Sequence, residues 1–488
     1  MSSPTEAASA THPSRDPGRP LASASDEPAP PAAPQSRAIG WRFPAAFWTA
    51  NIIEAAERAA YYGWFIMLAP FLTGIVGYSD IQAGYIGGCF AALLYLLPFV
   101  SGAVADRIGY RPALLIALAL LGSGYLSLGL WPQKHLVLGS MLLIMLGGAL
   151  VKPIITGTVA RSSDEAHRAR AFSLFYMMVN LGSFCGKTIA KPVRVSYGLA
   201  TMPILSAAAI GIALLVVALL YFPKSTTATA DGASPPPSTR SITEALKQLQ
   251  HDFLQVLKAG RLMALVLITS GFWIIQSQMY ASMPKYVLRT VGAHASPEWY
   301  ANVNPVMVVL CVVPITYLGR KLKPVTSMAI ALGLIPLSAL GIAFLPQLLG
   351  AVGPMHPVTF AMLAGIALQG CSECFLSPRY FEYASRLAPS GKEALYMGYA
   401  HLNNFFSWLI GYILSGYLLE AFCPDPAKLS APARAEYATA LRTATPLPAA
   451  YAHAHYLWLV FAGIGVVAFF SLLVFQQAVR RSTTAKSA

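Results

Sequence analysis

The sequence contains few charged residues for its length. Only 11% of its 488 residues are Asp, Glu, Lys or Arg, whereas 56% are hydrophobic. A water-soluble protein of this size needs far more charge to cover its surface, so the composition excludes a soluble globular fold. Because an open sheet edge would leave backbone groups unpaired in lipid, we expect a helical membrane protein.

Cysteine is also scarce. Five of the six cysteines lie inside apolar runs, and only Cys423 is expected to be exposed. Cys371 and Cys374 have the Cys-x-x-Cys spacing, which we interpret as two small packing residues on one helix. We therefore expect neither a disulfide framework nor a metal site.

Motifs of enzymes are missing from the sequence. It has no Glu-x-x-His cluster, no nucleophile elbow and no glycine loop of the kind that cradles phosphates. We expect no enzymatic activity, no catalytic residue and no cofactor. A receptor without transport activity, or a membrane enzyme, remains an alternative that the sequence does not support.

Long apolar runs dominate the sequence instead. Each is long enough to cross roughly 30 Å of hydrocarbon as a helix. We predict twelve spans, near residues 43–72, 80–104, 112–130, 136–160, 171–192, 200–222, 263–289, 301–318, 325–346, 357–387, 394–421 and 454–477.

The net charge of +14 follows from where Lys and Arg lie. They concentrate in alternate loops and at both termini, whereas the turns near Gly77 and Gly350 have none. By the positive-inside rule, both termini and the central linker are cytoplasmic in a multi-pass protein of the plasma (inner) membrane. The basic surplus therefore indicates topology, and we expect no nucleic-acid partner.

This pattern predicts an all-α polytopic protein built from two bundles of six helices. A Pro-, Ser- and Ala-rich stretch precedes the first bundle, and a polar segment with one amphipathic helix separates the two bundles. The predicted parts are a disordered cytoplasmic tail (1–40), an N-terminal bundle (41–222), a cytoplasmic linker (223–262), a C-terminal bundle (263–478) and a cytoplasmic tail (479–488).

Few charges are expected to remain within the spans. A charge facing lipid costs a few kcal/mol, so such residues usually face a cavity and carry function, although a static ion pair between helices is the alternative. By our assignment these residues are Glu54, Glu57, Arg58, Lys152, Glu373, Arg379 and Glu382.

The first span carries four of its polar residues on one face. Glu54, Glu57, Arg58 and Tyr61 follow the spacing i, i+3, i+4 and i+7. A carboxylate beside a guanidinium in a low-dielectric cavity can exchange its ion pair for a proton. Since arginine keeps its proton, we predict that Glu54 and Glu57 titrate and that the two acids and Arg58 couple protons.

The same stretch resembles a known family. Glu54-Ala-Ala-Glu57-Arg58-Ala-Ala-Tyr61-Tyr62-Gly63 is similar to the Glu-x-x-Glu-Arg-Phe-x-Tyr-Tyr-Gly signature of proton-dependent oligopeptide transporters, with Ala59 in place of Phe. Residues 102–111 look like the general major facilitator motif, whose Gly102, Asp106, Arg107, Gly109 and Arg111 would brace the cytoplasmic gate. Further similar stretches are 147–153, 172–183, 272–273, 304–305 and 373–378.

The resemblance implies a major facilitator fold with a substrate cavity between the bundles. Arg58 and Lys152 would lie near a substrate carboxylate, and Glu373 near its amino group. Further residues that the resemblance places in the pocket are Tyr61, Tyr62, Asn180, Trp273, Tyr280, Asn304 and Ser377. For each aromatic residue alone, ordinary helix packing is equally compatible with the sequence.

Some positions depart from the family pattern. The family commonly pairs an Arg after Tyr-Tyr-Gly with an acid in the seventh helix at the outer gate, where this chain has Phe65 and Ser277-Gln278. Because both partners are replaced, we expect a different gate contact. The sequence assigns no role to Arg379, Glu382 or His401, and a local ion pair is the simplest interpretation of Arg379 and Glu382.

These features predict a proton-coupled symporter that imports di- or tripeptides or similar small zwitterions. Its partners would be the substrate, protons and membrane lipid. The alternative is a major facilitator carrier or exporter of a non-peptide metabolite or drug. Side-chain preference, proton stoichiometry, direction and oligomeric state are left open by the sequence.

Overall fold

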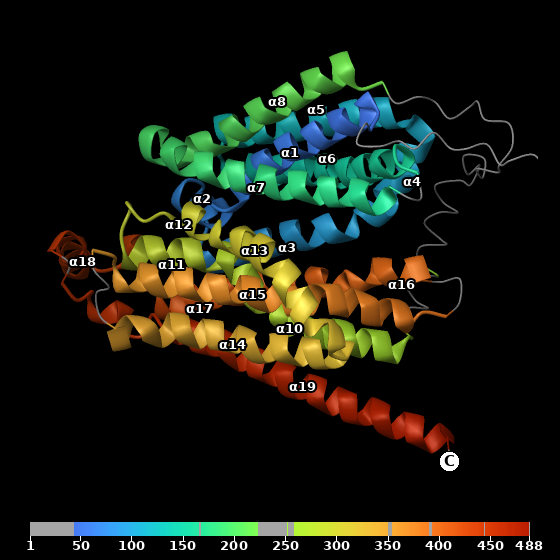
Figure 1. The fold of residues 1–488 in the computed structure, drawn as a ribbon. Helices are drawn as coiled ribbons and strands as arrows, with labels where there is room; N and C mark the ends of the chain where they lie inside the picture. The colour runs from blue at the N-terminus through green and yellow to red at the C-terminus, as the bar shows by residue number, and fades with distance from the viewer. Residues whose placement is uncertain are drawn as a thin grey trace, which may run out of the picture. The chain divides into compact units, whose positions relative to one another are not determined.

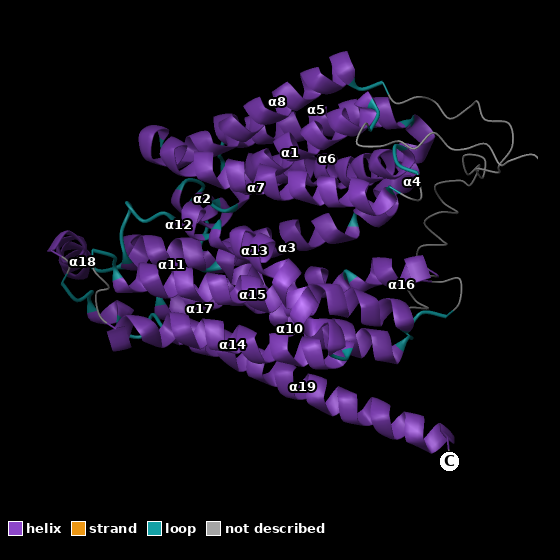
Figure 2. Cartoon of the chain, in the orientation of Figure 1, coloured by secondary structure: helices purple, strands orange, loops and turns teal. Residues whose placement is uncertain are grey.

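The computed structural model describes residues 43–164, 167–222, 251, 258–349, 354–389, 393–443 and 445–487. These residues belong to one compact unit, Phe43–Ala488. The described elements are helices joined by loops, as Figure 2 shows. The predicted all-α polytopic class is confirmed. The predicted N-terminal tail, and nearly all of the linker with its amphipathic helix, lie outside the described residues.

Six passes make up the N-terminal half of the unit. Its described α-helices are α1 (Ala45–Phe65), α2 (Leu68–Gly74), α3 (Asp80–Leu96), α4 (Pro98–Ile108), α5 (Tyr110–Leu130), α6 (Lys134–Arg161), α7 (Arg168–Tyr197) and α8 (Met202–Leu220). Contacts of α1 with α7, α8 and α6, and of α5 with α6 and α8, hold this bundle together. Figure 1 shows its helices, in blue to green, on one side of the unit.

Six further passes make up the C-terminal half. Its described α-helices are α10 (Gly260–Ala281), α11 (Met283–Thr290), α12 (Pro297–Tyr300), α13 (Val303–Leu318), α14 (Pro324–Leu349), α15 (Pro357–Arg386), α16 (Glu393–Ala400), α17 (Leu402–Phe422), α18 (Ala431–Thr443) and α19 (Tyr456–Ser487). The helix α19 extends beyond residue 477, where we predicted the last span to end. The core contacts of this half join α14 to α15 and α19, and α10 to α17 and α19.

Three of the twelve passes are not plain apolar helices. Nine helical segments in the described part of the chain are long and apolar enough to cross a membrane. The other passes are α1 with α2, α3 with α4, and α7. The first breaks between Phe65 and Leu68, the second breaks before Pro98, and α7 carries several Lys and Arg. Interrupted and charged helices of this kind are typical of binding regions in membrane proteins.

Glycines let the two halves approach closely at one seam, between α3 and α17. A methyl group on Gly84 would lie 2.6 Å from the carbonyl oxygen of Tyr412, and one on Gly416 would lie 2.6 Å from that of Asp80. Both contacts are too short for any larger residue. Small residues therefore bring the two backbones together here, as they do in other membrane helix pairs.

Candidate functional site

The charged residues of α1 form a buried group that we call the first-helix cluster (Glu54, Glu57 and Arg58). The guanidinium of Arg58 lies 2.5 Å from a carboxylate oxygen of Glu57 and 3.5 Å from one of Glu54. Both glutamates are 1% exposed. Neither carboxyl oxygen of Glu54 has a hydrogen-bond partner among the described residues. Two acids thus compete for one cation. Glu57 lies closer to Arg58, and Glu54 is left with fewer polar contacts.

The first-helix cluster borders a small cavity, the first-helix pocket, of about 50 Å³. Glu57, Arg58, Tyr61 and Tyr62 line it from α1, and Lys152 lines it from α6. The guanidinium lies 5.2 Å and 5.9 Å from the ring centroids of Tyr61 and Tyr62. Stacking on both rings fixes this cation at the pocket wall.

A second cavity, the central pocket, has a volume of about 190 Å³ and lies between the halves. Glu373 of α15 lines it, and its carboxylate accepts hydrogen bonds from the amides of Gln276 (3.0 Å) and Asn304 (3.4 Å). The central pocket shares Tyr62, Tyr95 and Trp408 with the first-helix pocket. The predicted residues that line the central pocket are Tyr62, Asn180, Trp273, Tyr280, Asn304 and Glu373.

A third cavity, the apolar pocket, adjoins the central pocket and has a volume of about 870 Å³. It shares Asn180, Trp273 and Glu373 with the central pocket and extends past Ser377 to His401, between α16 and α17. The three pockets are linked by the lining residues that they share, and their volume increases from the first-helix pocket to the apolar pocket, which reaches His401 beside α16. In Figure 1, α16 lies at the opposite end from α18.

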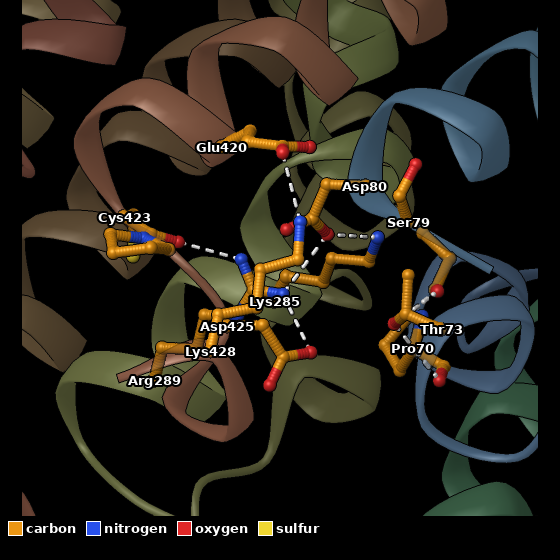
Figure 3. A network of polar contacts seen from close by, with 12 residues as sticks. Pro70, Thr73, Ser79, Asp80, Lys285, Arg289, Glu420, Cys423, Asp425 and Lys428 are labelled. Carbon is orange, nitrogen blue, oxygen red and sulfur yellow. Dashed lines mark hydrogen bonds and ion pairs between the residues drawn. The ribbon is translucent and has the colours of Figure 1, made fainter. Parts of the chain in front are cut away.

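The opposite end is held shut by a closed-end network of Asp80, Lys285 and Arg289 (Figure 3). Asp80 begins α3, and one of its carboxylate oxygens lies 2.7 Å from the ammonium of Lys285 and 3.0 Å from the guanidinium of Arg289. All three side chains are at least 93% buried. Because Asp80 belongs to the N-terminal half and both cations belong to α11, these ion pairs join the two halves.

Further contacts between the halves lie at the same end. Arg194 of α7 pairs with Glu298 of α12, which is fully buried, and the neighbouring Lys191 donates to Ser296. The helix α18 packs on the closed-end network, since the Tyr437 hydroxyl donates to the carbonyl of Arg289 at 3.0 Å. Burial raises the pKa of Tyr437 to about 12, so the hydroxyl keeps the proton that it donates.

Aromatic packing occupies the place where the family pattern has its gate pair. Phe65 is fully buried, and its ring centroid lies 5.3 Å from that of Tyr280 and 5.4 Å from that of Trp408. Gln278 bonds to the backbone carbonyls of Ile274 and Gly411, both in its own half. The expected different contact is therefore a hydrophobic one, and the charges that cross the halves come from the closed-end network and from the Arg194–Glu298 pair.

The motif at residues 102–111 braces helices within the N-terminal half. Asp106 of α4 lies 3.6 Å from Arg161 of α6, and Arg111 of α5 donates to the carbonyl of Ala218 on α8 at 2.9 Å. Gly109 joins α4 to α5 with a φ of +92°, which favours glycine. Arg107 lies in the last turn of α4, and Gly102 packs against Pro153 at ordinary distance.

Our assignment of the charges within the spans was incomplete. Lys187 is 1% exposed in α7, and Lys285 and Arg289 are buried in α11, all inside spans that we had predicted. A count of all charged residues from the first to the last residue of each predicted span includes them. Asp80 is the first residue of the predicted span 80–104 and was not counted among its charges, whereas Glu298 lies between two predicted spans, where an acid looks like part of a loop.

Two smaller expectations can be compared with the structure. Arg379 and Glu382 form a local ion pair of 2.7 Å, as the simplest interpretation predicted. The expectation that Cys423 is exposed is wrong: it is fully buried beside Arg289, which donates to its carbonyl at 2.6 Å, whereas Cys89 is exposed. A cysteine that follows a span is covered here by the segment that carries α18.

Comparisons with known proteins agree on the fold. Dipeptide and tripeptide permease B of Yersinia enterocolitica is 30% identical over 183 residues, 37% of this chain and 36% of that permease. The match thus spans about a third of that relative. Dipeptide and tripeptide permease A of Erwinia pyrifoliae is 24% identical over 396 residues, 78% of this chain and 76% of that permease.

Solved structures show the same architecture. The crystal structure of a POT family transporter in complex with 5-aminolevulinic acid superposes with a TM-score of 0.69 at 19% identity, and covers 89% of this chain and 96% of that one. Residues 52–354 match the family described as Major Facilitator Superfamily. This match covers more than half of the 488 residues, and the chain therefore belongs to the Major Facilitator Superfamily.

Proposed function

We propose that this chain is a proton-coupled symporter of the proton-dependent oligopeptide transporter family, and that it imports di- and tripeptides or similar small zwitterions. The observation that carries the proposal is the first-helix cluster at the wall of a cavity that continues to Glu373 in the other half. The names of the permeases that resemble this chain support the same substrate class.

The proposed coupling depends on competition for Arg58. While Glu57 is ionised, it holds the guanidinium at 2.5 Å. A proton on Glu57 weakens this ion pair and frees Arg58 to bind a substrate carboxylate. Glu57 therefore carries the proton, and substrate and proton enter the cavity together.

The zwitterion would also drive closure of the cavity. Arg58 and Lys152 belong to the N-terminal half, and Glu373 belongs to the C-terminal half. A substrate that binds both sets of charges favours the state in which the halves approach each other, because only a ligand with different affinities for two states shifts their populations.

The topology belongs to the same proposal. By the positive-inside rule, both termini are cytoplasmic in the plasma membrane, so the closed-end network faces outward and the apolar pocket opens inward. A tag at Ala233 tests this topology. It should react only in permeabilised cells, and labelling of intact cells contradicts the proposal.

Transport by a Glu57→Gln variant tests the coupling. In proteoliposomes the variant should lose proton-driven uphill uptake of dialanine by at least about 100-fold, because the amide takes up no proton, while counterflow persists. The matched control is Glu382→Gln, which removes an acid of the local pair with Arg379 and should keep uphill uptake. Proton-driven uptake by Glu57→Gln contradicts the coupling role.

Competition experiments test the substrate class. Unlabelled dialanine should inhibit uptake, whereas nucleosides and sugars should not. Inhibition by the non-peptide solutes with no effect of dialanine favours the alternative, a facilitator for another metabolite.

A further inference from the structure

Lys187 is a buried cation with no acidic partner. It lies in α7 with 1% of its surface exposed, and no carboxylate of the described residues forms an ion pair with it. Its ammonium donates to the carbonyl of Ala301 at 3.2 Å and lies 5.8 Å from the ring centroid of Tyr62. A buried charge without a counter-charge costs several kcal/mol, so this position favours binding of an anion.

A purely structural role explains Lys187 less well. Lys187, Lys191 and Arg194 follow the spacing i, i+4 and i+7 on α7, and the last two hold α12. However, Lys187 also lines the central pocket, which neither of the others does. A neutral amide could donate to the carbonyl of Ala301 equally well, so the positive charge is not needed for that contact.

The charges along the connected pockets do not balance in pairs. Arg58 is paired with Glu57, but Lys152 has no ion pair among the described residues, and its ammonium lies 5.4 Å from the ring centroid of Tyr95. Within the described part of the chain, Glu373 accepts hydrogen bonds only from the amides of Gln276 and Asn304. The cavity thus offers two cations, Lys152 and Lys187, and one acid, Glu373, to a bound molecule.

The geometry points to a peptide with an acidic side chain as the preferred substrate, with its side-chain carboxylate on Lys187. This inference rests on the proposed function. The substrate has one cation and two anions: its amino group binds Glu373, its terminal carboxylate binds Lys152 with Arg58, and its third charge binds Lys187. Each charge then meets an opposite one in a site of low dielectric, where pairing matters most.

The coupling proton fits the same charge pattern. When Glu57 carries it, the three cations Arg58, Lys152 and Lys187 exceed the two ionised acids, Glu54 and Glu373, by one positive charge. A substrate with a net charge of −1 cancels this excess, so proton and acidic peptide stabilise each other in the cavity.

The test compares two peptides of nearly equal shape, Ala-Glu and Ala-Gln, as competitors of labelled dialanine uptake in proteoliposomes. The wild-type protein should bind Ala-Glu about tenfold more tightly than Ala-Gln. This ratio of the two affinities corresponds to about 1.4 kcal/mol. Lys187→Gln should reduce the ratio to about one, and Lys187→Arg should retain most of it. Lys191→Gln is the matched control, since it removes a cation one turn away outside the pocket, and it should keep the wild-type ratio.

Each outcome decides the inference. Equal inhibition by the two peptides in the wild-type protein overturns it without any variant, so a variant that fails to fold does not block the test. An unchanged ratio in Lys187→Gln overturns it as well. If dialanine and both peptides fail to bind, the proposed function fails too, which separates this result from a failure of the Lys187 assignment alone.

Discussion

The two buried charge clusters differ in what they connect. The first-helix cluster belongs to one helix, and its three side chains are neighbours in the sequence. The closed-end network joins residues more than 200 positions apart and ties one half of the protein to the other. Among the described residues, neither carboxyl oxygen of Glu54 in the first cluster accepts a hydrogen bond, whereas in the second one oxygen of Asp80 serves two cations and the other accepts no hydrogen bond. Burial alone therefore does not tell a structural charge from an exchangeable one.

The largest expected effect is that of Asp80→Asn. It leaves Lys285 and Arg289 without their shared carboxylate, and removing one partner of a buried ion pair typically costs about 3–5 kcal/mol. The cost falls on the closed state, so the halves should separate at this end. Distances between spin labels at Ile75 and Glu436, both exposed, measure the opening.

The double variant Asp80→Leu with Lys285→Met is the control for this prediction. It removes one charge of each sign and should recover part of the closed population, because apolar replacement of a whole buried pair is often neutral. Unchanged spin-label distances in Asp80→Asn would show that the aromatic contacts of Phe65 hold this end shut without the charges.

Glu54→Gln is expected to have a smaller effect than Asp80→Asn, and to stabilise the protein if it changes its stability at all. Among the described residues the Glu54 carboxyl accepts no hydrogen bond and lies 3.5 Å from Arg58, so its loss should leave the free energy of unfolding unchanged or raise it by up to about 1 kcal/mol. Thermal unfolding in detergent measures this quantity. A loss of about 3 kcal/mol or more would instead make Glu54 the structural partner of Arg58, and would erase the contrast between the clusters.

The smallest effect is expected for Lys428→Gln beside the closed-end network. Its ammonium lies 2.8 Å from Glu420, but the two side chains are 45% and 36% exposed. Exposed pairs contribute about 0–1 kcal/mol and are screened by salt. The melting temperature should shift little, and less at high salt. A shift as large as that of Asp80→Asn would mean that exposure does not distinguish the two pairs.

The sequence predicts the helices well, and the site only in part. Apolar runs indicate burial in lipid directly, so the nine described segments that are long and apolar enough to cross a membrane follow from composition and spacing alone. The first-helix cluster is also local, because the spacing of Glu54, Glu57 and Arg58 defines one helix face. These are properties of single segments, which a single sequence contains in full.

Pairing between segments is different. Nothing in the sequence joins Asp80 to Lys285, since the contact depends on how the halves meet. Lys187 is an intermediate case: its place within a predicted span was a visible signal, but its missing counter-charge appears only in three dimensions. The charges at span ends are therefore the ones that sequence patterns assign least well.

The glycine seam between α3 and α17 has a mechanical consequence. Where side chains interlock, two surfaces cannot turn against each other without repacking, because packed interiors resist deformation. At Gly84 and Gly416 there are no side chains to interlock. These two close backbone contacts thus form a point about which the halves can pivot, while the ion pairs on one side break and the walls on the other side come together.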